Sequence, residues 1–415
     1  MHKQMDSHSD NNSDYDAVIV GAGIVGCLLA YALLKLKPTL RLALIDENPP
    51  SNSDNKTFTN PGFDARSLAL SAGTCDILSE LGFWDKIEAS AQPIEEICIS
   101  DRGSFGFLDL PRENKKQPFG YVLELHQIGH ALQRELDSLR QLKRLFNTKI
   151  NGIEKQPAQI LCHLQDGNTL TTKLCVAADG AGSLTRQLLA IPAQRADYAS
   201  SAIIANVRCS KPHLNRAFER FTEFGPIALL PLMDNRYSLV WSVANDDLDR
   251  LNALNESQFL AELQQAFGYR AGIFSEVGKR DTYPLTLVKT EQPFTHRGVC
   301  IGNAAHGLHP VMGQGFNLGM RDLFVLATII SGLQDTQQLG DFATLNGYWL
   351  AREADHNNTI GLTDSMVRLF NNSHWPIVLG RNIALQAMSY FPGLSAPIIK
   401  QAKGQFPLFS GDKNR

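Results

Sequence analysis

The sequence contains no apolar run long enough to span a membrane. A spanning helix needs about 20 consecutive apolar residues, and the two closest stretches of this 415-residue chain fall short. Residues 323–333 are too few, and the uncharged stretch 382–399 is interrupted by two prolines and a glycine. The polar segment 1–15 also lacks the apolar core of a signal peptide. We therefore expect it to be a disordered tail on a protein that is neither exported nor membrane-spanning.

Neither a strong charge imbalance nor a metal-binding cysteine pattern is present. Lys and Arg total 39 against 42 Asp and Glu, for a net charge of -3. No Lys/Arg-rich run occurs, which argues against nucleic acid as a partner. The seven cysteines are never in C-x-x-C spacing, so neither a zinc site nor a disulfide framework is indicated, and we predict no metal. Several fall in apolar runs, where a reduced cysteine acts as a small hydrophobe, and this favours a cytoplasmic location.

The segment 16–46 carries the clearest motif of the chain. The short β-branched run 17–20 predicts a buried strand. Gly21, Gly23 and Gly26 then fit the spacing G-x-G-x-x-G. In that motif the first glycine permits a tight turn, the second lets the backbone approach a pyrophosphate, and the third lets the helix pack on the strand.

The residues after this turn complete a dinucleotide-binding unit. A helix is expected over 24–37, with its N-terminal N–H groups directed at phosphates, and Pro38 ends it. A second apolar strand, 40–45, places Asp46 at its carboxyl end, where a carboxylate can accept hydrogen bonds from a ribose diol. The unit predicts dinucleotide binding without saying which dinucleotide, and a glycine turn with no ligand is the alternative.

Two further glycine sites follow strands later in the chain. Asp179-Gly180 lies just beyond the buried strand 174–178, at the edge where open α/β sheets bind ligands. A plain Asp-Gly turn is the alternative there. Asn303 ends another short strand, and a glycine-rich loop then opens a long helix near Gly315. The N-terminus of that helix can stabilise negative charge on a bound ring such as a reduced flavin, although a loop built for close packing would use the same glycines.

The remaining segments predict a second domain and a helical end. Arg66 precedes a helix expected from residue 71, and an arginine there would suit a phosphate site, though a surface arginine is the default. Other expected elements are a hairpin over 95–110, a strand over 120–125, a leucine-striped helix over 130–145, short strands over 148–178, a substantial antiparallel sheet with one helix over 199–288, and helices from 339 to about 391 before an irregular end. The apolar residues of 375–385 form either a helical cap or an exposed patch for a membrane surface or a partner.

The three glycine sites occur in the order and approximate separation typical of one flavoprotein family. The stretches GAGIVG, ADGAGSLTR and GNAAHGLHPVMGQGFNLG resemble those of the single-component flavin aromatic hydroxylases, which are similar to p-hydroxybenzoate hydroxylase. Within that class, GFDARSLALSAGT, ISDRGSFGFL, AFERFTEFGPIALLPL, SLVW and GLTDSMVRLF resemble the ubiquinone-biosynthesis hydroxylases. The resemblance extends from about residue 16 to residue 370, nearly the whole chain.

This resemblance implies FAD as the cofactor and gives each candidate residue a role. Gly21, Gly23 and Gly26 would hold the pyrophosphate, Asp46 the adenosine ribose, Arg66 the phosphate or ribityl region, Asp179 and Gly180 a position near both FAD and NAD(P)H, and Gly315 and Asn317 the flavin ring. Asn303 replaces the family's usual aspartate. An amide also accepts a hydrogen bond from a ribityl hydroxyl, so FAD binding is retained.

The implied fold class is α/β, with a discontinuous Rossmann-type FAD-binding domain, an antiparallel-sheet substrate domain and a helical C-terminal region. The expected boundaries are 16–94 with 118–195 and 290–335 for the FAD-binding domain, 95–117 with 196–289 for the substrate domain, and 336–415 for the helical region.

The resemblance also implies a reaction. NAD(P)H, as a transient reductant, would reduce FAD, and O2 as co-substrate would give a hydroperoxide at flavin C4a that hydroxylates a polyprenylated phenol. Such a substrate implies contact with the inner face of a membrane, and other ubiquinone-biosynthesis proteins are candidate partners. An FAD-dependent epoxidase or reductase of an isoprenoid, or a non-catalytic FAD-bearing subunit of a quinone-synthesis assembly, is the alternative. No catalytic residue is assigned, because His306 and His309 can either move a phenol proton or only shape their loop.

Overall fold

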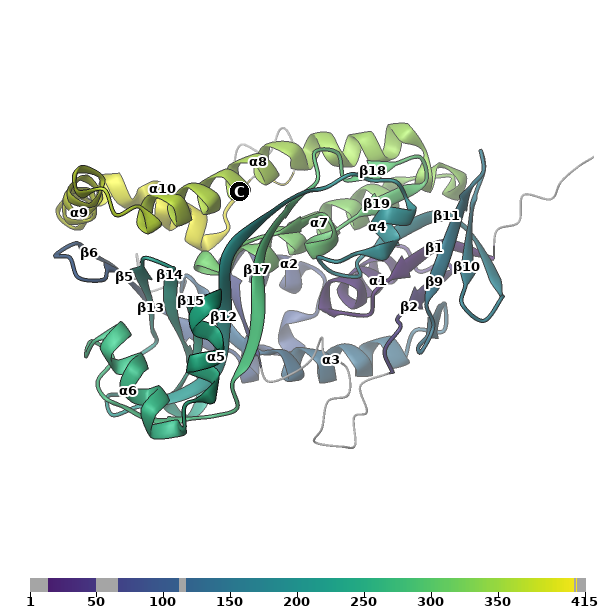
Figure 1. The fold of residues 1–415 in the computed structure, drawn as a ribbon. Coiled ribbons are helices and arrows are strands. Elements are labelled where there is room, and N and C mark those ends of the chain that lie inside the picture. Colours follow the sequence, from purple (N-terminus) through teal and green to yellow (C-terminus); the bar gives the residue numbers. More distant parts are fainter. Residues whose placement is uncertain (1–13, 50–65, 112–116, 407, 409–415) are drawn as a thin grey trace, which may run out of the picture.

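The structure is a computed structural model and describes residues 14–49, 66–111, 117–406 and 408. Most of the predicted disordered tail and the polar loop after residue 49 lie outside the described residues. The described chain folds into three sheets and a set of long helices (Figure 1). The fold class predicted from the sequence, α/β with a Rossmann-type unit, a second sheet and a helical C-terminal region, is confirmed.

The first sheet is built around parallel strands from distant parts of the chain. β1 pairs in parallel with both β2 and β11, β2 with β8, and β11 with β19. The strands of this sheet are β1 (Tyr15–Val20), β2 (Leu42–Ile45), β8 (Leu142–Leu145), β9 (Ile150–Lys155), β10 (Ile160–Leu164), β11 (Thr169–Ala177), β18 (Phe294–Thr295) and β19 (Gly298–Cys300). Because β1, β2, β11 and β19 run the same way, their carboxyl ends meet at one edge, which is where α/β sheets bind ligands.

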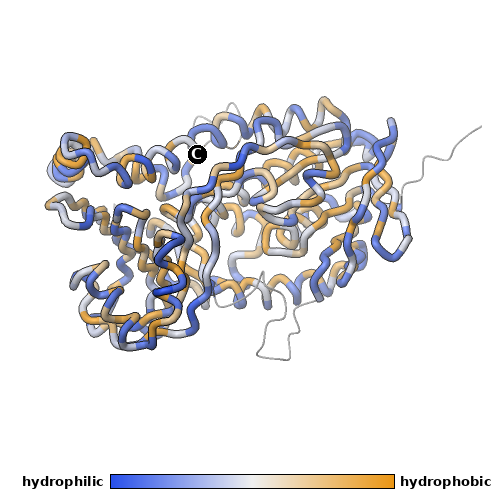
Figure 2. The backbone as a smooth tube through the Cα atoms, in the orientation of Figure 1, coloured by the Kyte–Doolittle hydropathy of each residue, from blue (hydrophilic) through white to orange (hydrophobic). Residues whose placement is uncertain are grey.

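Apolar helices cover the first sheet. Helix α1 (Ile24–Leu36) is buried over most of its length and packs against α7 (Gln314–Gly332). Figure 2 shows these segments and the strands beneath them largely in the hydrophobic colour. The other helices of this region are α2 (Ala72–Glu80), α3 (Leu125–Asp137) and α4 (Leu184–Leu188).

The second sheet has nine strands and closes the other side of the molecule. Its spine is β12, a 16-residue strand that pairs antiparallel with β15, β16 and β17. The sheet is mixed, because β5 and β13 pair in parallel. Its strands are β5 (Glu96–Asp101), β6 (Phe107–Pro111), β12 (Gln194–Cys209), β13 (Arg216–Thr222), β14 (Gly225–Leu232), β15 (Arg236–Ala244), β16 (Phe274–Val277), β17 (Asp281–Lys289) and β20 (His306–Gly307), with helices α5 (Asn245–Ala253) and α6 (Glu256–Phe267).

A small third sheet and the C-terminal helices join the two larger sheets. The third sheet contains β3 (Ser67–Ser71), β4 (Gln92–Ile94) and β7 (Gly120–Glu124). The C-terminal helices are α8 (Phe342–Asn371), α9 (Trp375–Tyr390) and α10 (Pro392–Lys403). Figure 1 shows α8 lying along α7 and α9 at the far end of the molecule.

Three expected elements differ from the structure. The segment 199–288, expected to contain one helix, contains two, α5 and α6. The predicted helix 130–145 is instead α3, which ends at Asp137, followed by strand β8, which pairs along β2 from Leu42 to Ile45. The leucine spacing alone could not show this, because the exposed edge of β2 supplies the hydrogen bonds that make the last four residues a strand. The end of the chain, expected to be irregular beyond 391, continues as α10 to residue 403.

Candidate functional site

One cavity of about 1090 Å³ extends from the carboxyl edge of the first sheet to the inner face of the second. Nine of the ten residues proposed for the cofactor line it: Gly21, Gly23, Asp46, Arg66, Asp179, Gly180, Asn303, Gly315 and Asn317. Gly26 does not line the cavity. The three glycine sites, separated by more than 100 residues in the sequence, therefore converge on one space.

Each glycine of the first turn has a different physical role. Gly21 has φ +107°, and a Cβ there would lie 2.4 Å from the carbonyl oxygen of Ala178, so this turn packs against the second glycine site. A Cβ on Gly26 would lie 1.9 Å from the carbonyl oxygen of Gly21, so it permits close packing of helix on strand. A Cβ on Gly23 would meet nothing within 4 Å, because Gly23 faces the cavity.

Asp46 ties the end of β2 to this turn. Its carboxylate accepts hydrogen bonds from the backbone N–H of Ala22 at 2.6 Å and from that of Asn48 at 2.8 Å. A carboxylate has about four acceptor positions, so Asp46 can still accept from a ribose hydroxyl.

The second glycine site is held by its own aspartate. The Asp179 carboxylate accepts from the Ser183 hydroxyl and, at 3.0 Å, from the backbone N–H of Thr185, and so it holds the start of α4. Gly180 follows with φ +84°. On the other side of the cavity the guanidinium of Arg66 lies 4.7 Å from the ring centre of Tyr283, so this cation is also at the cavity wall.

The third site is the start of α7. Gly313, with φ +61°, precedes the helix, and neither a side-chain cap nor an acidic residue occupies its first turn. Asn303 is exposed to the cavity. Asn317 lines it, but its side chain is fully used: the amide oxygen accepts from Ser71 N and Thr74 Oγ1, and the amide nitrogen donates to Ala69 O and Gly313 O. Asn317 thus fixes α7 against β3, and its side chain is not available to a ligand.

These features fit a bound FAD. The N-termini of α1 and α7 both open into the cavity without side-chain caps, so their N–H groups are available to a pyrophosphate and to a ring that becomes negatively charged. The space beyond Gly23 is where a phosphate can approach the backbone.

The half of the cavity lined by the second sheet is mainly apolar and contains one residue that the sequence analysis did not single out. Glu219 on β13 is 6% exposed, and among the described lining residues it is the one carboxylate that the second sheet contributes. Burial raises the pKa of Glu219 to about 8, although a backbone hydrogen bond from Met312 lowers it slightly. A signal existed: alternation places Glu219 on the same strand face as the buried Ala217 and Phe221, where a charged residue is unexpected.

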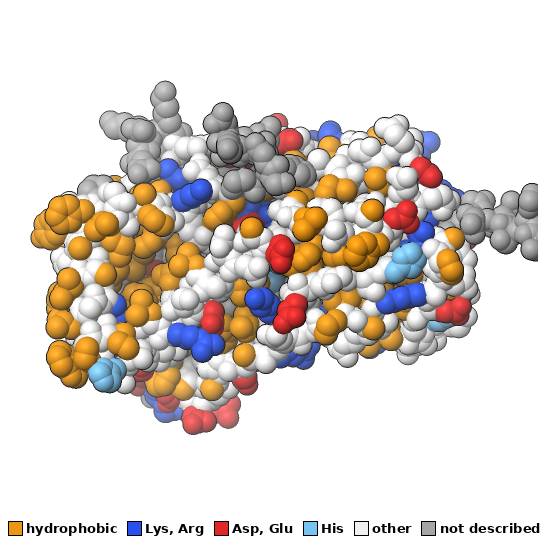
Figure 3. Space-filling view, turned by 90° about the horizontal axis from the view of Figure 1, so that it is seen from above, with side chains coloured by type: hydrophobic (Ala, Val, Ile, Leu, Met, Phe, Trp, Pro, Cys, Tyr) orange, Lys and Arg blue, Asp and Glu red, His pale blue; other side chains and the backbone are white. Residues whose placement is uncertain are grey.

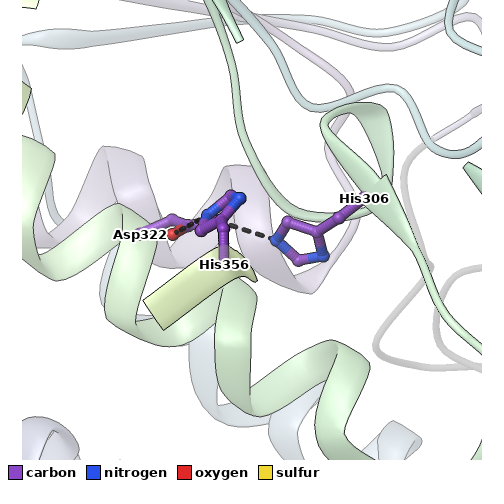
Figure 4. Close-up of side chains that lie close together, drawn as sticks. All are labelled: His306, Asp322 and His356. Atoms are coloured by element: carbon purple, nitrogen blue, oxygen red, sulfur yellow. Dashed lines mark hydrogen bonds and ion pairs between the residues drawn. The ribbon is translucent and has the colours of Figure 1, made fainter. Parts of the chain in front are cut away.

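The two histidines considered in the sequence occupy different environments. His309 lines the cavity, and burial lowers its pKa to about 4. Neither ring nitrogen of His309 has a hydrogen-bond partner in the part of the chain that the structure describes, and the ring packs edge-on to Tyr198 with centres 5.2 Å apart. His306 is fully buried and does not line the cavity. Its Nε2 lies 2.8 Å from the carboxylate of Asp322. Figure 4 shows these side chains close together.

His306 belongs to a buried charge network between α7 and α8. The Asp322 carboxylate also contacts His356 Nε2 at 2.7 Å and accepts from Arg352 Nε at 2.8 Å (Figure 4 draws the two histidines). Burial alone would raise the pKa of Asp322, but His356, Arg352 and the two histidine hydrogen bonds hold it well below its usual range. His306, Asp322 and His356 are close enough to share a metal ion. We interpret them as a hydrogen-bond network, because the arginine already occupies the same carboxylate.

A parallel sheet with three ligand-facing glycine turns, joined through one cavity to a second sheet, defines a flavoprotein of the FAD-dependent monooxygenase class. Comparison with known proteins agrees. The family model described as "FAD binding domain" matches residues 14–337. The chain is 33% identical over 394 residues to ubiquinone hydroxylase UbiL of Rhodospirillum rubrum, covering 95% of this chain and 90% of that protein.

Two further similarities extend over most of the chain. It is 27% identical to the 3-demethoxyubiquinol 3-hydroxylase of Escherichia coli, covering 95% of this chain and 99% of that protein. The fold matches the crystal structure of p-nitrophenol 4-monooxygenase PnpA from Pseudomonas putida with a TM-score of 0.75 at 17% identity, covering 94% of this chain and 98% of that one. The chain belongs to the FAD-binding family of ubiquinone-biosynthesis flavin hydroxylases and is an FAD-dependent monooxygenase.

Proposed function

We propose that this enzyme hydroxylates the ring of a polyprenylated phenol in ubiquinone biosynthesis, with NAD(P)H as transient reductant and O2 as co-substrate. The observation that carries the proposal is the continuity of the cavity, which joins the three glycine turns to a mainly apolar chamber formed by the second sheet. An electron-rich ring in that chamber would face the start of α7. The sequence motifs given above resemble those of 2-octaprenyl-6-methoxyphenol hydroxylase, which supports such a substrate.

The protein's own groups would bind, orient and shield the reactants. Bound FAD would supply the redox chemistry, passing reducing equivalents from NAD(P)H to O2. The N-terminus of α1, Gly23 and Asp46 would hold the nucleotide, and the N-terminus of α7 would stabilise charge on the ring. The apolar walls contributed by residues such as Ile204, Leu230 and Val240 would exclude water from the reacting atoms.

The test is product analysis with purified FAD-loaded enzyme. The protein is reduced anaerobically with NADPH, and in parallel with NADH, and is then mixed with oxygen and 2-prenyl-6-methoxyphenol, a short-tailed probe. We expect a product that has gained one oxygen atom on its ring. A product with oxygen on the tail would indicate an epoxidase, one that has gained only hydrogen would indicate a reductase, and no turnover would favour the non-catalytic subunit. Each of these three results contradicts the proposal.

We further propose that the enzyme contacts the membrane surface through α9 and α10. No helix in the described part of the chain is long and apolar enough to cross a membrane. Nevertheless, large apolar side chains are exposed here, and Figure 3 shows hydrophobic side chains gathered at the end of the molecule where Figure 1 places α9. We define the α9–α10 apolar patch as Trp375, Ile377, Leu379, Ile383, Tyr390, Phe391 and Leu394.

A membrane suits this patch because the same region leads to the cavity. Ala402 of α10 lines the cavity, so a substrate tail leaving the lipid beside α10 has a short path inward. The single charge within α9, Arg381, does not interrupt the patch, because it is paired with Asp101 at 2.8 Å and its side chain is 7% exposed.

Vesicle flotation tests the membrane contact. A Trp375→Ser/Phe391→Ser double variant should bind vesicles of phosphatidylethanolamine and phosphatidylglycerol at least about tenfold more weakly than wild type, because two large apolar groups no longer enter the lipid. Tyr269→Ser/Ile273→Ser is the matched control, since these side chains are 70% and 59% exposed elsewhere. Equal loss in both double variants, or a wild type that does not float, would refute the contact. In the second case, pull-down with other ubiquinone-biosynthesis proteins would test the alternative partner.

A further inference from the structure

Glu219 is an acidic side chain in apolar surroundings. In the second sheet its register partners are Ile99 of β5 and Ala228 of β14, neither of which is polar. Residues of its own strand face, Ala217 and Phe221, belong to an apolar core cluster with Ile99. Glu219 also lines the cavity. A buried carboxyl group with apolar neighbours destabilises a fold, so its presence calls for a functional reason.

Among the described residues, one hydrogen bond to Glu219 is found, and it connects Glu219 to the cofactor side of the cavity. The backbone N–H of Met312 donates to Glu219 Oε1 at 3.5 Å, a long contact. Met312 has φ +54° and lies in the loop between His309 and the start of α7. Glu219 is therefore fixed beside the loop that leads to the helix N-terminus proposed to face the flavin ring, yet one carboxylate oxygen remains for a ligand.

Two carboxylates on neighbouring elements are already paired with arginines. Asp101 of β5 pairs with Arg381, and Asp364 of α8 pairs with Arg368. Lys403 of α10 lies over the ring of Phe119. Two other titratable groups of this region are Tyr198, whose hydroxyl donates to Asp364, and His309, which lines the cavity. Within the described residues Glu219 forms no ion pair, so neither an arginine nor a lysine holds it in the charged form.

We propose that Glu219 is the base that takes the proton from the phenolic hydroxyl of the substrate, which rests on the proposed function. The phenol O–H bond breaks, a new O–H bond forms on the carboxylate, and the electron pair stays on the phenol oxygen. This raises the electron density of the ring carbon that receives oxygen. When the hydroxylated ring regains aromaticity, its C–H proton leaves to water and the former phenol oxygen takes the proton back from Glu219, which ends the cycle ionised.

The environment of Glu219 supports this role. Burial raises the pKa of the Glu219 carboxyl group to about 8. This value is closer to the pKa of a phenol, about 10, than the pKa of an ordinary carboxyl group is. Such a base removes a phenolic proton with a smaller penalty. His309 adds a neutral imidazole to the same chamber, which can position a second ring oxygen through one of its unpartnered nitrogens.

The first test is the pH dependence of oxygen transfer in a single turnover. The reduced FAD-loaded enzyme with 2-prenyl-6-methoxyphenol is mixed with oxygen between pH 6 and 9.5, and product formation is followed. Because the ionised form of Glu219 is the base, the wild-type rate should rise with pH through an apparent pKa near 8. Glu219→Gln should lower the rate about 100-fold and remove the rise, and Glu219→Asp should retain it at a lower rate.

The control is Glu223→Gln, an exposed glutamate after the same strand, which should behave as wild type. FAD content and the rate of flavin reduction by NADPH should be the same in all variants. A Glu219→Gln enzyme that keeps both the wild-type rate and its rise with pH overturns the proposal. A wild type that never hydroxylates the probe instead refutes the proposed function, and the second test then decides the role of Glu219.

The second test does not depend on turnover. The same phenol is bound anaerobically to the oxidised holoenzyme, and the ultraviolet difference spectrum is recorded against pH. In wild type and Glu223→Gln the phenolate band should appear at a higher pH than for the phenol in solution, because Glu219, ionised above about pH 8, opposes a second negative charge beside it. In Glu219→Gln the band should appear at least one pH unit lower than in wild type, because that charge is absent. An identical phenolate titration in wild type and Glu219→Gln would show that this carboxylate does not lie beside the phenolic hydroxyl.

Discussion

Gly23 and Gly26 have different roles, so replacing each with alanine should change a different property. Gly26→Ala should lower the stability of the fold, and Gly23→Ala should lower the affinity for FAD. In Gly26→Ala the new Cβ would lie 1.9 Å from the carbonyl oxygen of Gly21, whereas ordinary contact begins at 3.4 Å, so α1 and the turn must separate by about 1.5 Å (3.4 minus 1.9). Forcing a methyl group into a packed interface costs about 1 to 3 kcal/mol or more. We expect Gly26→Ala to lose about 3 kcal/mol of unfolding free energy even without FAD.

Gly23→Ala should leave the stability of the FAD-free protein unchanged and weaken the binding of FAD. Gly23 has φ -68° and ψ 177°, which alanine adopts without strain, and its Cβ would enter open space. The unfolding free energy of the FAD-free protein should therefore stay within about 0.5 kcal/mol of wild type. The methyl group would, however, occupy the position proposed for the pyrophosphate, so FAD affinity should fall at least tenfold, or about 1.4 kcal/mol.

Urea unfolding of the FAD-free proteins and fluorescence titration with FAD measure both quantities. The prediction depends on the contrast between the two variants rather than on either alone. If Gly23→Ala binds FAD as tightly as wild type, the pyrophosphate does not lie at this turn. If Gly26→Ala unfolds at the same urea concentration as wild type, α1 does not pack as closely against the glycine turn as the structure shows.

Three further predictions concern buried polar groups. Asn317→Ala removes the partners of Ser71 N, Thr74 Oγ1, Ala69 O and Gly313 O, and should cost about 3 kcal/mol or more of unfolding free energy in urea. Asp322→Asn leaves the buried arginines Arg352 and Arg321 with Asp355 as their one shared carboxylate and should cost about 3 to 5 kcal/mol by the same assay, whereas the partly exposed control Asp364→Asn should cost less than about 1 kcal/mol. Glu219 has a folded pKa of about 8 against 4.5 for the free group, so the protonated form favours folding and wild-type stability is lost as pH rises from 4.5 through 8. Glu219→Gln should match wild type at pH 4 and exceed it by about 3 kcal/mol at pH 7 (2.5 pH units at 1.36 kcal/mol each), and equal stability of the two proteins at both pH values would show that folding does not raise the pKa of Glu219.

The first sheet could be predicted from the sequence because its signals are local. Strand β1, the glycine turn and helix α1 follow one another without interruption, and the structure places them within a residue or two of the expected positions. The helix expected over 130–145 was wrong in its second half because β8 exists only through pairing with β2, about 100 residues earlier in the chain. A leucine pattern carries no information about a free strand edge so far away.

The candidate site also has one half that local sequence signals predict and one half that depends on contacts between distant segments. Its cofactor half consists of turns in which glycine is required for steric reasons. Such turns can be recognised in the sequence, and residues of all three line one cavity. Its substrate half consists of side chains at alternate positions of β12, β13, β14 and β15, whose order in the sheet differs from their order in the sequence. Glu219 was therefore missed, although its inward position on β13 could have been suspected from the alternation alone.

Helix α7 is the element on which both halves of the site depend, and its position is fixed from two sides. Asn317 joins its first turn to β3 through two hydrogen bonds and to Thr74 of α2 through a third, and Asp322, one and a half turns later, joins it to Arg352 and His356 of α8. Both connections are buried, so neither is weakened by solvent or salt. The N–H groups at the start of α7 are therefore in place before any ligand binds, and binding need not supply the free energy to order them. A dipole held in this way stabilises developing charge without reorganising, which is the condition under which electrostatic stabilisation in an active site is strongest.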